Sequence, residues 1–111
     1  MKKTYNKMVR DKIPTIIKEN GQIGEYLQLD SNRYAIELRR KLNEEVGEYL
    51  ETMDEIAATE ELADILEVIH SLAKFHNKSF DEVENVRQQK FKERGGFEKG
   101  LLLVSTTNKM N

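Results

Sequence analysis

Cysteine is absent from the 111 residues of the chain. This absence excludes a disulfide framework and a thiolate metal site, and it agrees with a reducing compartment. The longest apolar run, Leu101 to Val104, is far shorter than the roughly 20 residues that cross a bilayer. Met1 to Lys3 is not followed by the apolar stretch of a signal peptide. We therefore expect a cytoplasmic protein without a membrane partner.

An excess of either charge is also missing. The chain has 18 Lys and Arg against 20 Asp and Glu, which gives a formal net charge of -2. Without a basic excess we expect no binding to a nucleic-acid polymer. The charges are nevertheless segregated: residues 2–18 carry six bases and one acid, and residues 44–67 carry ten acids and no base. This distribution is typical of an acidic centre with basic margins.

The hydrophobic pattern predicts a single all-α domain over residues 1–111. Apolar residues spaced three and four apart predict a long helix from Asp30 or Ser31 to about Ala57. Thr59 is expected to cap the next helix, which runs to about Phe75. A connection of only two residues, Ala58 and Thr59, predicts an antiparallel helix hairpin.

Two shorter helices are expected on either side of this hairpin. Asp11 is the expected cap of a helix through about Asn20, with Gly21 as its end. Ser79 is followed three residues later by a Glu, which is a capping box for a helix that ends at Arg94 before two glycines. Short extended segments are expected at residues 22–29 and 97–106, the latter as a short strand.

Four acids of the hairpin lie near its apolar face. With about 100° of rotation per residue, Glu45 falls inside the apolar arc of the first long helix, and Glu48 lies about 60° from Glu45, at the edge of that arc. Glu61 and Asp64 take the equivalent positions on the second long helix. An antiparallel hairpin that buries both arcs brings these four carboxyl groups to one edge of the core.

Such a cluster needs compensation, because like charges about 4 Å apart cost on the order of 4 kcal/mol per pair at an effective dielectric near 20. Protonation is one solution and a hard divalent cation is another. Mg²⁺ prefers carboxylates, waters and phosphate oxygens, so we expect Mg²⁺, with Mn²⁺ as a substitute. The alternative is an ordinary solvated acidic face. A di-iron bundle repeats a Glu and a His three residues apart on two helices, whereas Glu67 and His70 provide one such pair; we expect His70 at the surface.

The arrangement of the acids has a counterpart in a known family. EEVGE at residues 44–48 is followed by twelve residues and then ELAD. It resembles the EExxE and ExxD signature of the all-α nucleoside triphosphate pyrophosphohydrolases, which include MazG-like enzymes, dimeric dUTPases and phosphoribosyl-ATP pyrophosphohydrolases. YNKMVRDKIPTII and KFKERGGFEKGLLL are similar to the amino- and carboxy-terminal segments of a MazG-like, phosphoribosyl-ATP-pyrophosphohydrolase-like subgroup.

The resemblance implies hydrolysis of the α-β phosphoanhydride of a nucleoside triphosphate with Mg²⁺. By position, Glu45 and Glu48 match the first ligand pair of the family, and Glu61 and Asp64 match the second. Glu44 matches the leading Glu, which binds metal or orients the attacking water, so Glu44 and Glu45 are the expected catalytic residues. The resemblance also implies that the hairpin completes a four-helix core in a homodimer or homotetramer, and a hydrophobic content of 38% is lean enough to agree.

Basic side chains are expected to meet the phosphate oxygens of such a substrate. The candidates are Lys41, Arg10, Lys12, Lys90 and Arg94. Each is equally compatible with a solvated surface base. The main hypothesis is thus a nucleotide pyrophosphohydrolase that removes non-standard nucleotides. The alternatives are a phosphoribosyl-ATP pyrophosphohydrolase and a catalytically silent helical interaction module, and no residue indicates which nucleobase is selected.

Overall fold

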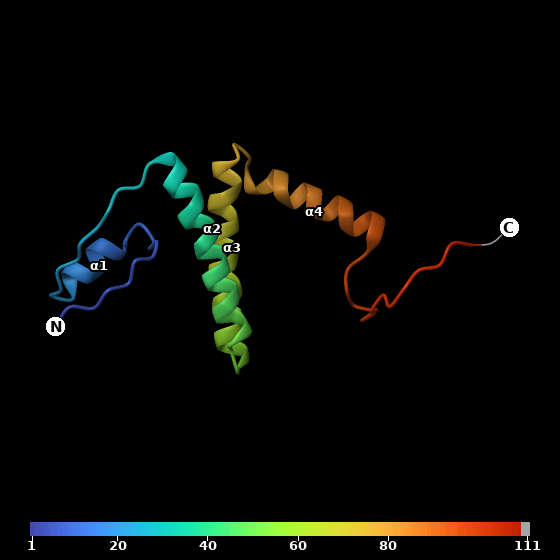
Figure 1. Cartoon of the computed structure of the whole chain (residues 1–111), viewed down its shortest axis with the longest axis horizontal. Coiled ribbons are helices and arrows are strands. Elements are labelled where there is room, and N and C mark those ends of the chain that lie inside the picture. Colours follow the sequence, from blue (N-terminus) through green and yellow to red (C-terminus); the bar gives the residue numbers. More distant parts are fainter. Residues whose placement is uncertain (110–111) are drawn as a thin grey trace. The chain divides into compact units, whose positions relative to one another are not determined.

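The computed structural model of the chain describes residues 1–109, which form four helices and no strand (Figure 1). The helices are α1 (Ile13–Glu19), α2 (Ser31–Leu50), α3 (Glu55–Phe75) and α4 (Phe80–Arg94). The all-α prediction is therefore confirmed. The short strand expected at residues 97–106 is not found, and residues 22–29 lie outside the helices.

The chain divides into two compact units, of which the first is Met1–Phe80 and the second begins at Asp81. The first unit contains α1, α2, α3 and Phe80, the first residue of α4, and the second contains the rest of α4. One domain over residues 1–111 stays a prediction. Within residues 1–109 no helix has both the length and the apolar character needed to cross a membrane.

The α2–α3 hairpin is the centre of the first unit, and its two helices lie side by side in Figure 1. They are joined by residues 51–54, not by the predicted connection at residues 58–59. The reason is local: the Asp54 side chain accepts a hydrogen bond of 2.8 Å from the Ala57 amide and caps α3. Thr59 instead lies inside α3, where its hydroxyl donates to the Glu55 carbonyl. Apolar spacing continued past the end of α2 and concealed this boundary.

The hairpin buries a small core and leaves an apolar face exposed. Leu38, Val68 and Ala73 are the buried apolar residues in the described part of the chain. On the helical rotation used above, several exposed apolar residues fall on the side of the hairpin away from Glu48 and Asp64. We call this set the apolar face: Val46, Leu50, Leu62 and Leu66.

The ends of the other helices show which caps operate. α1 has Lys12 at its N-cap without a side-chain hydrogen bond, so the predicted Asp11 cap is wrong, while Pro14 lies in the first turn as expected. Gly21 follows α1 with φ of 76°, a left-handed conformation that suits glycine. α4 begins directly after Ser79 and ends at Arg94, as predicted.

His70 differs from its expected position at the surface. It is half-buried, and its ring stacks on Phe80 with centroids 3.9 Å apart and an interplanar angle of 5°. The apolar partner at the start of α4 could not be identified from the pattern of α3 alone. His70 therefore packs against Phe80, the last residue of the first unit.

Candidate metal centre

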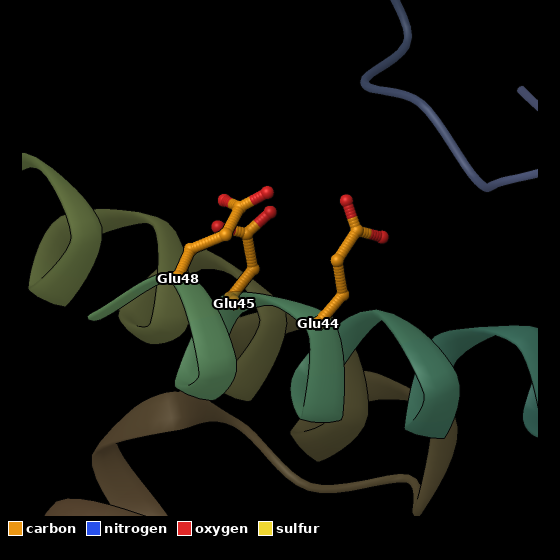
Figure 2. Close-up of side chains that lie close together, drawn as sticks. All are labelled: Glu44, Glu45 and Glu48. Atoms are coloured by element: carbon orange, nitrogen blue, oxygen red, sulfur yellow. The ribbon is translucent and has the colours of Figure 1, made fainter. Parts of the chain in front are cut away.

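The five acids of the family-like signature come together on the hairpin. Glu44, Glu45 and Glu48 lie on α2, and Glu61 and Asp64 lie on α3. Carboxylate oxygens within 4.8 Å of one another occur in two groups, Glu44–Glu45–Glu48 and Glu45–Glu61–Asp64. Figure 2 shows the α2 side chains projecting to one side of their helix, with the Glu45 and Glu48 carboxylates adjacent. We call these five residues the acid cluster.

Glu45 is the shared member of both groups and the most deeply placed. Only 6% of the Glu45 surface is exposed to solvent, and Glu45 is the one charged residue within residues 1–109 that is buried. One oxygen of Glu45 and one of Glu61 are buried without a hydrogen-bond partner. A buried carboxylate oxygen that has lost its water and gained no donor is costly. The cluster therefore contains oxygen atoms whose bonding capacity the protein itself leaves unused.

Proximity of the acids perturbs their ionisation. Burial, followed by the hydrogen bond with Glu45 and the negative charges of its neighbours, raises the pKa of Glu61 to about 7. Burial and the charge of Glu45 also raise the pKa of Glu48. Burial opposes ionisation of Glu45, but hydrogen bonds with Lys41 and Glu61 outweigh it and lower the Glu45 pKa. Glu61 is thus the acid of the cluster that binds a proton most readily.

The raised pKa of Glu61 predicts how the stability of the metal-free protein depends on pH. Because the Glu61 pKa is raised from 4.5 to about 7, folded Glu61 binds a proton across an interval in which the unfolded chain does not. The stabilisation is complete below pH 4.5 and is lost as the pH rises through 7. We expect the melting temperature in EDTA to decrease as the pH is raised from 4.5 to about 7. Glu48 acts in the same direction and Glu45 in the opposite one.

Melting curves of the parent chain and of Glu61→Gln, recorded across this pH range, check the prediction. The variant should lose much of the slope, because its amide does not titrate. Glu60→Gln is the matched control, since Glu60 is exposed on the same helix. An unchanged slope in Glu61→Gln would assign the pH dependence to other groups.

Within residues 1–109, three basic side chains contact the acid cluster. Lys41 Nζ lies 3.4 Å from Glu44 and 3.2 Å from Glu45. Lys7 Nζ lies 3.1 Å from Glu44, and Arg10 Nη2 lies 2.6 Å from Asp64. With every carboxylate ionised, the cluster retains an excess of two negative charges, which is the charge that one divalent cation neutralises.

The predicted phosphate-binding residues have different surroundings. Lys41 and Arg10 contact the cluster directly. Lys12 is exposed at the start of α1 and has no ion pair within residues 1–109. Lys90 and Arg94 are exposed on α4, in the second unit. A phosphate-binding role for these last three residues stays a prediction.

Comparison of the chain with known protein families, curated proteins and solved structures finds no match. Membership of the MazG-like family therefore stays an expectation from the sequence motifs.

Sequence reasoning missed one neighbour of the cluster, Lys7. It lies in the basic stretch of residues 2–18, but nothing in the local pattern distinguishes it from the other lysines there. A hollow of about 230 Å³ is lined by this part of the chain and by α2. Its lining residues are Asn6, Lys7, Met8, Glu37, Arg40, Lys41 and Glu44.

The donor set fits a hard divalent cation. All the clustered groups are carboxylates, two of their oxygens lack a partner, and the charge excess is negative. Oxygen-only ligands favour Mg²⁺ or Mn²⁺ over softer metals. The di-iron alternative gains no support, because neither Glu67 nor His70 belongs to a potential ligand group in the described chain.

Proposed function

We propose that the protein is a Mg²⁺-dependent nucleotide pyrophosphohydrolase of the MazG-like kind. It would cleave the α-β phosphoanhydride of a nucleoside triphosphate to a monophosphate and pyrophosphate, with removal of non-standard nucleotides as its cellular role. The observation that carries this proposal is the buried carboxylate of Glu45. It belongs to acidic groups from two helices and keeps one oxygen without a protein partner.

The residues of the acid cluster would have different roles in this reaction. Glu45, Glu48, Glu61 and Asp64 would hold the ion, which when bound neutralises charge on the phosphate oxygens. Glu44 is half-buried and is paired with Lys7 and Lys41 beside the ion site. It is the group placed to accept a proton from an attacking water. Lys41 and Arg10 are the cations nearest to the substrate phosphates.

Association of subunits belongs to the same proposal. The apolar face of Val46, Leu50, Leu62 and Leu66 is exposed in the single chain, while three apolar residues make up its buried core. A second copy that covered this face would complete a four-helix core on the side of the hairpin away from the acids. A homodimer or homotetramer is the assembly we propose.

Two rivals need separate tests. A phosphoribosyl-ATP pyrophosphohydrolase would use the same cluster on a different nucleotide, so a substrate panel distinguishes it. A catalytically silent interaction module would have no use for the unpartnered oxygens of Glu45 and Glu61. Metal binding therefore separates this second rival.

The first experiment measures pyrophosphate release from ordinary, deoxy, modified and phosphoribosyl-linked triphosphates, with Mg²⁺ or Mn²⁺ present. We expect release with at least one substrate and none in EDTA. The second experiment follows thermal melting during a Mg²⁺ titration, with NaCl at equal ionic strength as the control. A free Mg²⁺ concentration of 100 times the dissociation constant should stabilise the folded chain by about 2.7 kcal/mol. Absence of both effects would refute the enzyme.

A further inference from the structure

The segment of residues 6–10, which we call the strap, is tied to both helices of the acid cluster. Lys7 pairs with Glu44 on α2 at 3.1 Å, and Arg10 pairs with Asp64 on α3 at 2.6 Å. The partners are 37 and 54 residues apart in sequence. The hydrogen bond to Glu44 raises the pKa of Lys7, so both strap groups are cations. The strap thus brings two positive charges to the place where a divalent ion would bind.

These ion pairs are loose enough to exchange. The Arg10 side chain is 57% exposed to solvent, and the Lys7 side chain is 41% exposed. Exposed pairs of this kind are individually weak, because water and salt screen them. Neither cation is needed to fill the core. Each can leave its carboxylate when a stronger partner arrives.

A bound divalent cation would compete with Arg10 for the Asp64 oxygens, and its charge would repel Lys7, which pairs with Glu44 beside the ion site. Asp64 and Glu44 each belong to a group of potential metal ligands. A unit charge about 6 Å from a divalent ion lowers its affinity roughly tenfold in water. Arg10 and Lys7 would then lose their partners, and Lys7 lines a hollow together with Arg40 and Lys41. A guanidinium in this situation is well suited to phosphate, which it binds through parallel hydrogen bonds.

We propose that Arg10 and Lys7 are exchangeable counter-ions: they neutralise the acid cluster when metal is absent, and they bind the β- and γ-phosphates of the substrate when metal is present. The proposal rests on the proposed function and adds the position of the polyphosphate end, between the strap and α2. The strap would therefore couple loading of the ion to capture of the substrate.

Arg10→Gln tests this exchange without any turnover. Calorimetric titration with Mn²⁺ alone should give roughly tenfold tighter binding than in the parent chain, because a competing charge is gone. Titration of the Mn²⁺-loaded protein with pyrophosphate should give at least roughly tenfold weaker binding, because a charge-assisted hydrogen bond is lost. Pyrophosphate is the probe because it carries the phosphates without a nucleobase.

Three comparisons make the result specific. Lys7→Gln should change both affinities in the same directions, and Arg10→Lys should restore Mn²⁺ binding to near the parent value because it keeps the charge. Lys18→Gln removes an exposed charge of the same sign elsewhere in the first unit and should change neither. Circular dichroism confirms that each variant is helical.

The outcomes separate this inference from the function on which it rests. Unchanged or weaker Mn²⁺ binding by Arg10→Gln would overturn the exchange and make Arg10 a support for Asp64. Unchanged pyrophosphate binding, or equal effects in Lys18→Gln, would overturn it as well. A parent chain that binds no Mn²⁺ would instead refute the proposed function, and the exchange with it.

Discussion

Asp64→Asn and Glu48→Gln are each expected to lower turnover of a nucleoside triphosphate by at least about 100-fold. Each substitution keeps the size of the side chain and removes one of the charges that would hold the ion. Glu48 is exposed and Asp64 is half-buried, so neither change should disturb the core. Steady-state kinetics across a range of Mg²⁺ concentrations, with circular dichroism of each variant, measures the effect.

Glu60→Gln is the control for these variants, since it removes an exposed carboxylate from α3 outside the acid cluster. Its turnover should match that of the parent chain. If Asp64→Asn and Glu48→Gln also retained full activity, the ion would have to be held elsewhere. A partial recovery at high Mg²⁺ would locate the defect in ion affinity.

Glu45→Leu is expected to make the metal-free protein more stable by about 1–2 kcal/mol. The reason is that Glu45 is a buried charge with an unpartnered oxygen, surrounded by other carboxylates. Leucine removes that repulsion and adds apolar area beside the core. Lys41 keeps Glu44 as a partner. Urea denaturation in EDTA measures the gain, and the same variant should show no stabilisation by Mg²⁺.

Glu45→Gln distinguishes the two contributions, because it removes the charge without adding apolar contact. Its stability in EDTA should lie between those of the parent and Glu45→Leu. A less stable Glu45→Leu would show that the ion pair with Lys41, at 3.2 Å, stabilises the fold by more than the repulsion among the neighbouring carboxylates destabilises it. The acid cluster would then stabilise the fold without any metal.

The sequence predicts the middle of the hairpin well because helical rotation is a local property. Rotation of about 100° per residue placed Glu45 inside the apolar arc, and Glu45 is buried in the structure. The same rule placed Glu61 and Asp64 on the matching edge of the partner helix, and the three residues form one group. The rule succeeds here because few turns separate these acids from the apolar residues used as reference.

Other features depend on contacts that periodicity does not encode. The start of α3 is fixed by the hydrogen bond between Asp54 and Ala57, a local capping contact that the continuing apolar spacing concealed. The pairing of Arg10 with Asp64 joins residues 54 apart in sequence, and many lysines or arginines would satisfy the same charge rule. His70 was misplaced for a similar reason, since Phe80 lies beyond its own helix.

The connection at residues 51–54 has a consequence for the geometry of such a centre. All five carboxylates lie between Glu44 and Asp64, so one continuous stretch of backbone carries the whole donor set. The relative positions of these carboxylates therefore depend on the length of a single turn. Lengthening the turn would be more disruptive than exchanging any distant loop, because it would rotate one half of the donor set away from the other.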